Sequence, residues 1–217
     1  MLSLIETTHP QWHEMLDKAF AVMDKDYLQS LKKNTDYLPQ YANLLAAFNS
    51  SLDSMRYILL GESPYPRLQS ANGYAFWDNA VESLWSNKGL SKEVNRATSF
   101  RNMMKMLLLA RGDLQVCSLT QEAISHLDKS DYWQTAAELF QSFVNKGFLL
   151  LNASLVYAPN QVRFHAKHWK PFMASLFEQF ISLKLPVKFV LFGQIAAQVP
   201  GIDALPHLKA EHPYKLT

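Results

Sequence analysis

The sequence predicts an α/β protein, a three-layer α/β/α sandwich on a central sheet of four parallel strands. Two observations support this prediction. Short apolar runs that end at glycine, proline or a polar residue are typical of strands buried on both faces. Helical stretches separate these runs, and alternating strands and helices favour a parallel sheet with helices on both sides. Residues 1–217 contain no repeat, low-complexity tract or evident linker, so we expect one domain.

The first third of the chain is expected to be mainly helical. Apolar residues recur at helical spacing through residues 10–34, which predicts one helix there. A second helix is expected over residues 38–50, after a Leu-Pro break. The first strand is expected at residues 57–60, where four apolar residues end at Gly61.

Three further strands and three helices complete the predicted fold. The strands are expected in the apolar runs at residues 147–152, 187–193 and 205–211. The helices are expected at residues 98–111, 131–146 and 167–183.

Composition narrows the class of protein without identifying its chemistry. Apolar residues make up 48% of the chain and charged residues 18%, which suits a folded core and excludes a disordered chain. No apolar run reaches the ~18–20 residues that span a bilayer. The N-terminus lacks the basic and apolar segments of a secretory signal, so we expect a cytoplasmic protein if the host is bacterial. The net charge of +2 neither requires nor excludes nucleic acid.

Neither a metal nor a cofactor is expected. The single cysteine, Cys117, excludes a disulfide within the chain and an iron–sulfur cluster. Because its neighbours are apolar, we expect Cys117 to be buried rather than nucleophilic. His165 and His168 are spaced to lie on one helical face, but no third ligand is evident. No Walker loop and no Gly-x-Gly-x-x-Gly motif is present.

Open parallel sheets bind ligands beyond the carboxyl ends of their strands. Those ends are expected at residues 61–66, 152–154, 193–194 and 212–213. Residues 61–66, Gly-Glu-Ser-Pro-Tyr-Pro, contain one glycine and two prolines, which favour a stiff loop that can direct backbone donors and Tyr65 at a ligand. Taken alone, the hexapeptide is more typical of an ordinary strand-to-helix turn than of a ligand-binding loop.

Several motifs, in order and in register, resemble those of the uracil-DNA glycosylases. Residues 61–66 and Gly-Tyr-Ala-Phe at 73–76 resemble the family's Gly-Gln-Asp-Pro-Tyr-His and Gly-Leu-Ala-Phe-Ser. Leu-Leu-Leu-Asn at 149–152 is similar to its Leu-Leu-Leu-Asn strand, and residues 212–217 resemble its His-Pro-Ser-Pro-Leu-Ser. Three more segments resemble family motifs: residues 37–48, the helix start at Ser99 with Asn102, and residues 189–198. The resemblance covers nearly the whole chain and implies an α/β/α sandwich on four parallel strands.

The resemblance implies hydrolysis of the bond between uracil and deoxyribose in DNA, on a nucleotide flipped out of the helix. It assigns the base pocket to Tyr65, Phe76 and Asn152. Phe76 would stack on the base, the Asn152 amide would pair with its N3–H and O4 edge, and Tyr65 would fill the space that a thymine methyl needs. His212 would donate a hydrogen bond to O2 of the departing base and stabilise its developing charge.

The resemblance also implies the contacts with DNA. Leu216 would enter the gap left by the flipped base. Ser99 and Thr217 would contact phosphates, with Lys215 nearby. The implied partner is therefore uracil-containing DNA, single- or double-stranded, and we expect the protein to act as a monomer.

The first motif departs from the family at its centre. Ser63 stands where the family has its catalytic aspartate, which orients water and offsets positive charge on the sugar. Serine has no charge at neutral pH, and losing a positioned general base costs ~10²–10⁴ in rate. Glu62 stands one residue earlier, as in the Gly-Glu-Ala-Pro-Gly of the iron–sulfur uracil glycosylases, which also lack the aspartate. Ser63, with Glu62, is therefore the candidate for holding the attacking water.

Two further departures leave the function class open. The chain stops at Thr217, soon after the His-Pro motif, and residues 78–96 are longer than the family's connection. We expect a surface helix in residues 78–96, with a lid or a partner surface as the alternative. The leading hypothesis is a slow glycosylase in base-excision repair that acts on uracil or a related damaged base, and altered base choice stays open as a third possibility. The alternative is a weakened or inactive glycosylase fold that binds DNA, uracil or a protein partner; retention of Asn152, Phe76 and His212 favours the first.

Overall fold

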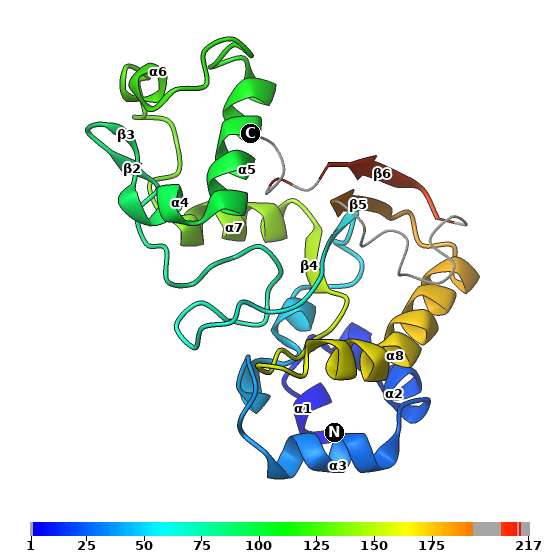
Figure 1. The fold of residues 1–217 in the computed structure, drawn as a ribbon. Coiled ribbons are helices and arrows are strands. Elements are labelled where there is room, and N and C mark those ends of the chain that lie inside the picture. Colours follow the sequence, from blue (N-terminus) through cyan, green and yellow to red (C-terminus); the bar gives the residue numbers. More distant parts are fainter. Residues whose placement is uncertain (1, 193–204, 212, 214–217) are drawn as a thin grey trace.

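A parallel sheet of four strands lies at the centre of the computed structural model, which describes residues 2–192, 205–211 and 213 (Figure 1). The strand order is β4-β1-β5-β6, so β1 has a partner on each side. Tyr57 of β1 lies opposite Phe148 of β4 and Lys188 of β5. The strands are β1 (Tyr57–Gly61), β4 (Phe148–Asn152), β5 (Lys188–Phe192) and β6 (His207–Ala210), one in each predicted apolar run.

Helices cover both faces of this sheet and complete the predicted α/β/α arrangement (Figure 1). One side carries α1 (Leu2–Ile5), α2 (His13–Ala21), α3 (Lys25–Lys33) and α8 (Val162–Ser182). The other side carries α4 (Lys92–Arg96), α5 (Thr98–Arg111), α6 (Gln121–Ser125) and α7 (Ala136–Asn145). Three short 3-10 turns are η1 (Pro10–Trp12), η2 (Tyr41–Asn43) and η3 (Ala46–Asn49). A small hairpin joins β2 (Trp85–Ser86) to β3 (Gly89–Leu90).

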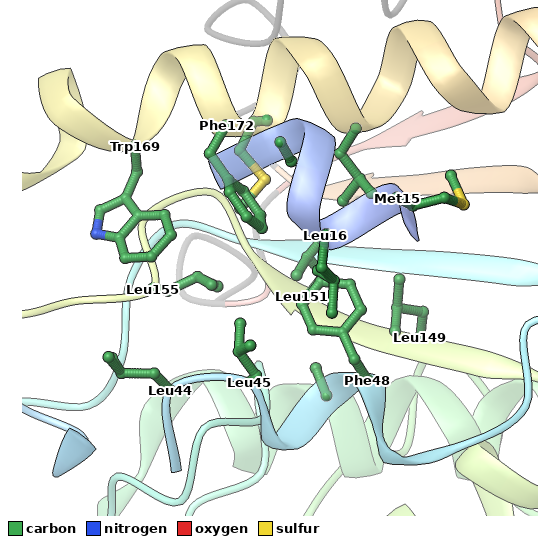
Figure 2. Close-up of a cluster of buried hydrophobic side chains, with 14 of the residues drawn as sticks. Met15, Leu16, Leu44, Leu45, Phe48, Leu149, Leu151, Leu155, Trp169 and Phe172 are labelled. Carbon is green, nitrogen blue, oxygen red and sulfur yellow. The ribbon is translucent and has the colours of Figure 1, made fainter. Parts of the chain in front are cut away.

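Alternation along the strands divides the core into two clusters. Ile58 and Leu60 of β1 face the α2 and α8 side, whereas Leu59 faces the α5 and α7 side. Figure 2 shows the first cluster, in which side chains of α2 and α8 pack over Leu149 and Leu151 of β4. Since β1, β4 and β5 bury apolar side chains on both faces, the hydrophobic effect favours a sheet between two helical layers, whereas the four residues of β6 are exposed.

Two predicted helices at the start of the chain are wrong. The helix expected over residues 10–34 is interrupted after α2, because the Asp24 carboxylate accepts the Tyr27 N–H at 2.8 Å and begins α3 as an N-cap. The helix expected over residues 38–50 is absent; η2 and η3 occupy part of that stretch. Leu38 instead exchanges two backbone hydrogen bonds with Tyr157, each 2.8 Å long.

Boundaries of the later helices follow their caps. The helix predicted at residues 98–111 is confirmed as α5, which ends at Gly112 in the left-handed conformation (φ 84°). Helix α7 begins later than predicted because Thr135 and Glu138 form a capping box. Helix α8 begins earlier than predicted, at Val162. In the described part of the chain, no helix is long and apolar enough to cross a membrane.

The segment at residues 78–96 and the environment of Cys117 also differ from expectation. The segment starts as an irregular loop, continues as the β2–β3 hairpin and forms a helix, α4, only in its last residues. Cys117 is exposed, in the connection between α5 and α6. The expectation of burial is wrong because apolar neighbours such as Val116, which is 77% exposed, also face solvent there.

Candidate functional site

The carboxyl ends of β1 and β4 are joined by their backbones. Gly61 and Asn152 lie opposite each other at the last position of the two strands. The Gly61 carbonyl accepts the Ala153 N–H at 2.8 Å, and the Glu62 carbonyl accepts the Ser154 N–H at 3.0 Å. The first residues of both loops therefore leave the sheet as one connected surface, where a parallel sheet is expected to bind its ligand.

Glycine at position 61 makes room for the Asn152 amide. A Cβ at Gly61 would lie 2.5 Å from the Asn152 Oδ1 and 3.0 Å from the Ala75 Cβ. A side chain there would therefore displace either the amide or the loop that carries Ala75. Asn152 is 3% exposed, so its amide is held in one place at the strand end.

The loop after β1 returns over the strand ends and brings Phe76 to them. The Ala75 N–H donates to the Leu150 carbonyl of β4 at 3.0 Å. The Tyr65 hydroxyl donates to the Phe76 carbonyl at 3.1 Å. The half-buried Phe76 ring meets Phe192, at the end of β5, edge to face at 5.7 Å between ring centroids. These contacts gather Tyr65 and Phe76 beside the Gly61–Asn152 pair.

Phe76 has a left-handed backbone, with φ 63°. Such a conformation costs a non-glycine residue on the order of 1–3 kcal/mol and persists only where surrounding contacts hold it. The hydrogen bonds on either side of Phe76 supply contacts of that kind. Strain of this type is common at ligand sites, where it directs a side chain that regular structure would place elsewhere.

Burial keeps the Tyr65 phenol in its neutral form. Burial, followed by the negative charge of Asp78, raises the pKa of Tyr65 above its ordinary value of 10, while Arg67 acts in the opposite direction. The hydroxyl therefore remains a hydrogen-bond donor to the Phe76 carbonyl through neutral and mildly alkaline pH. Arg67 and Asp78 themselves form an ion pair of 2.9 Å within the same loop.

The two residues expected to hold water lie directly after β1. Glu62 is exposed and Ser63 is half-buried. The Ser63 hydroxyl can both donate to and accept from a water molecule, but it has no charge at neutral pH. The structure therefore brings a neutral hydroxyl to this position, with the Glu62 carboxylate exposed next to it in the chain.

The expected phosphate-binding helix lies against the end of the chain. Ser99 is half-buried in the first turn of α5. One turn later, the buried Asn102 amide donates to the carbonyl of Pro213, which is also buried. The start of α5 therefore lies beside Pro213. His212, Lys215, Leu216 and Thr217 lie outside the described residues.

The histidine pair lies in an aromatic cluster on α8. The Tyr27 hydroxyl and the His165 Nδ1 are 2.8 Å apart, and the Tyr27 ring stacks on His168 at 4.4 Å. Burial, with a smaller contribution from His168, lowers the pKa of His165. Within the described ranges, no group of three His, Cys, Asp or Glu side chains is arranged to hold a metal ion.

A solved structure decides the family. The crystal structure of the wild-type UNG from Nitratifractor salsuginis is 37% identical, and the match covers 99% of this chain and 87% of that one with a TM-score of 0.91. The chain belongs to the uracil-DNA glycosylase family. A mutant of the same UNG, with glycine in place of one tyrosine, has the same identity and TM-score.

Other uracil-DNA glycosylases are more distant in sequence. The Streptococcus mutans enzyme is 23% identical over 218 residues, which covers 96% of this chain and 85% of that protein. The Exiguobacterium sibiricum enzyme is 26% identical, and the match covers 96% of this chain and 85% of that protein. The mimivirus uracil-DNA glycosylase, at 17% identity and a TM-score of 0.63, shares the fold. No family model matches the chain.

Sequence reasoning about this glycosylase site missed two features. The first is the close approach of Asn152 to Gly61, which depends on strands distant in sequence. The second is the Arg67–Asp78 pair, eleven residues apart in an irregular loop. Opposite charges on either side of the Gly-Tyr-Ala-Phe motif were the available signal, but loop residues have no periodicity that predicts which side chains meet.

Proposed function

We propose that the protein is a DNA glycosylase that hydrolyses the N-glycosidic bond of uracil in DNA and releases free uracil slowly. The observation that carries this proposal is the juxtaposition of the Asn152 amide with the loop of Tyr65 and Phe76 at the joined ends of β1 and β4. A fixed amide and an aromatic ring are the groups that recognise a planar base with one donor and one acceptor on its edge.

Recognition of uracil follows from the chemistry of these side chains. The Asn152 Oδ1 accepts from N3–H of uracil, and its Nδ2 donates to O4. Cytosine presents an acceptor at N3 and a donor at C4, so a fixed amide leaves both of its groups unpaired with cytosine. Phe76 stacks on the base, and the Tyr65 ring occupies the space of a thymine C5-methyl.

The reaction breaks the bond between N1 of uracil and C1′ of the sugar. The electron pair leaves with the base, whose negative charge spreads onto O2, where His212 donates a hydrogen bond. A water molecule held by Ser63 and Glu62 adds its oxygen to C1′, and its proton passes through solvent to the uracil anion, which gives neutral uracil. Ser99, Lys215 and Thr217 hold the backbone phosphates, and Leu216 enters the gap left by the base.

The replacement of aspartate by Ser63 determines the expected rate. A carboxylate at this position orients water and offsets the positive charge of the sugar, whereas a hydroxyl performs only the first task. We therefore expect Ser63→Asp to raise the rate of uracil release by about 10²-fold or more. The assay uses single-stranded DNA with one uracil, at high enzyme concentration, beside matched thymine, cytosine and hypoxanthine strands.

Asn152→Asp tests the base pocket in the same assay. The carboxylate accepts from N3–H but repels O4, so uracil release and binding should fall by about 10²-fold or more. Asn145→Asp is the matched control, because Asn145 is exposed at the end of α7, before β4 begins, whereas Asn152 is the last residue of β4. Unchanged uracil binding by Asn152→Asp would disprove the pocket assignment.

The uncharged Ser63 favours a second candidate function, a module that binds uracil-containing DNA without cleaving it. The same two variants separate the candidates. Release by the wild-type chain that increases in Ser63→Asp indicates a slow enzyme. Selective binding of the uracil strand without release from either protein indicates the binding module.

A further inference from the structure

Three contacts join the two sides of the loop after β1. Tyr65 bonds the Phe76 carbonyl, and Arg67 pairs with Asp78. In the third contact, the Ser70 carbonyl accepts the Asn79 N–H at 3.1 Å. The ion pair is the middle crosslink and the only one of the three that joins two side chains. The loop with the two pocket aromatics is therefore closed along its length.

The carboxylate of this ion pair is buried, whereas its cation reaches solvent. The side chain of Asp78 is 1% exposed and that of Arg67 is 55% exposed. Both carboxylate oxygens have partners, since Oδ1 accepts the Ala80 N–H at 3.0 Å and Oδ2 accepts the Arg67 guanidinium at 2.9 Å. Removing one partner of a buried pair leaves a charge without compensation, so the loop must open or shift to solvate it.

Phe76 lies two residues before the buried Asp78. Trp77, between them, stacks on Phe140 of α7 with ring centroids 5.6 Å apart and an angle of 11°. The strained Phe76 backbone is thus held from both directions, by Tyr65 on one side and by Trp77 and Asp78 on the other. Asp78 and Arg67 also act electrostatically on the Tyr65 hydroxyl, which bonds Phe76.

We propose that the Arg67–Asp78 ion pair is a positioning pair that determines base specificity, because it holds Phe76 and Tyr65 at the separation that admits uracil and excludes thymine. This inference rests on the proposed function of the same pocket. Neither residue needs to touch the base. Opening the loop gives the thymine methyl room and removes the support under the stacking ring, so selectivity falls more than affinity for DNA as such.

The test measures binding, since cleavage is not required for the inference. The probes are two single-stranded oligonucleotides that differ in one base, uracil or thymine. In both, the sugar of that nucleotide carries a 2′-fluorine, which disfavours the cationic sugar and prevents hydrolysis. The readout is the ratio of the thymine Kd to the uracil Kd. We expect Arg67→Ala to lower this ratio about tenfold and Arg67→Lys to restore much of it.

Two controls separate positioning from other roles of Arg67. Arg111→Ala removes an arginine from another ion pair of 2.9 Å, with Asp113 at the end of α5, and should leave the ratio unchanged. If Arg67 only contacts DNA phosphates, Arg67→Ala weakens the uracil and thymine complexes equally. The ratio of the two Kd values then stays constant, and the proposal is overturned. If Arg67→Ala does not fold, the uncharged double variant Arg67→Gln with Asp78→Asn replaces it.

Hydrogen exchange tests the positioning independently of base preference. In Arg67→Ala, or in the double variant, protection should fall at the amides of Ala75 and Ala80, whereas Leu38 and Tyr157 should keep theirs. Unchanged protection at Ala75 and Ala80 would overturn the proposal. If the wild-type protein binds the thymine and uracil strands with equal Kd, the proposed function is refuted. Hydrogen exchange would then decide separately whether the ion pair holds the loop.

Discussion

Two tyrosines, the buried Tyr27 and the half-buried Tyr65, crosslink two different regions of this molecule. Tyr65 joins the sides of the loop after β1 through the Phe76 carbonyl, and Tyr27 joins α3 to α8 through His165. Burial raises the pKa of both phenols, so both hydroxyls remain protonated and neutral. The side chain and the type of interaction are therefore alike, whereas the surroundings differ.

The surroundings explain why only one of these regions is proposed to bind a ligand. Tyr27 lies among the rings of His168 and Trp169, between helices of regular conformation. Tyr65 holds Phe76, whose φ of 63° is strained, at the ends of two strands. The same hydrogen bond stabilises packed helices in one region and directs a strained aromatic ring in the other. Strain at a strand end is therefore a better indicator of the site than the residue types alone.

The largest expected effect is that of Gly61→Ala, which breaks the strand-end region. The new Cβ would meet the Asn152 Oδ1 at 2.5 Å and displace the amide. Since a 1 Å displacement in a site can cost about 10²-fold in rate, we expect uracil release to fall by at least that factor. Gly112→Ala at the end of α5 is the control: a Cβ there meets nothing within 4 Å, and its positive φ should cost only about 1 kcal/mol of stability. Equal activity losses in both variants would contradict the role given to Gly61.

A matched pair of Tyr→Phe variants tests the comparison directly. Tyr65→Phe removes the donor to Phe76 and should lower uracil release about tenfold, while the retained ring still excludes thymine. Tyr27→Phe leaves His165 without this partner and should lower the free energy of unfolding by about 1–3 kcal/mol without changing release. Urea denaturation and the uracil-release assay provide the two readouts. If Tyr27→Phe alters release as much as Tyr65→Phe, the division between the regions is wrong.

The smallest expected effect is a dependence of stability on pH in the α3–α8 region. Burial and His168 lower the pKa of His165 below its usual 6.5. The unfolded chain therefore binds more protons as the pH falls below 6.5, and the free energy of unfolding falls by at most about 1.4 kcal/mol per pH unit from this group. Tyr27 and His168 contact the ring, and Asp36 and Tyr37 line the cavity of about 260 Å³ beside it.

His165→Gln isolates that contribution. Urea denaturation at pH 7.5 and pH 5.5 should show a smaller loss of stability in the variant than in the wild-type chain. Binding selectivity for uracil should be the same in both proteins, because His165 lies in the other region. An identical pH dependence of unfolding in both proteins would contradict the assignment.

The sequence predicted the strands better than the early helices. Buried strands appear as continuous apolar runs, as in β1, β4 and β5, and the weaker run at residues 205–211 contains the exposed strand β6. The break between α2 and α3 depends on the Asp24 side chain bonding the Tyr27 N–H, which hydrophobic periodicity does not detect. The connection near η2 and η3 has helical composition, but Leu38 pairs with the distant Tyr157, and tertiary pairing overrides local preference.

The sequence predicted which residues meet at the strand ends but not the contacts that support them, and the roles of these residues in binding a base remain predictions. Asn152, Tyr65 and Phe76 come together at the strand ends, in accordance with the rule for parallel sheets. The glycine beneath the amide and the ion pair within the loop depend on distances that a sequence does not contain. The roles of Ser63 and Glu62 remain predictions, and those of His212 and the residues after Pro213 concern positions outside the described structure.

The central place of β1 has a consequence for synthesis of the protein. This strand leaves the ribosome first, yet its neighbours begin only at Phe148 and Lys188. At about 5–20 residues per second, β1 waits on the order of ten seconds for β4, with its apolar side chains and edge amides uncovered. Gly61 and Asn152 meet only after that delay, so a growing chain lacks the proposed base pocket until most of it has been made. Chaperones that shield exposed strand edges should therefore affect the yield of this protein more than they affect proteins whose strands pair with near neighbours.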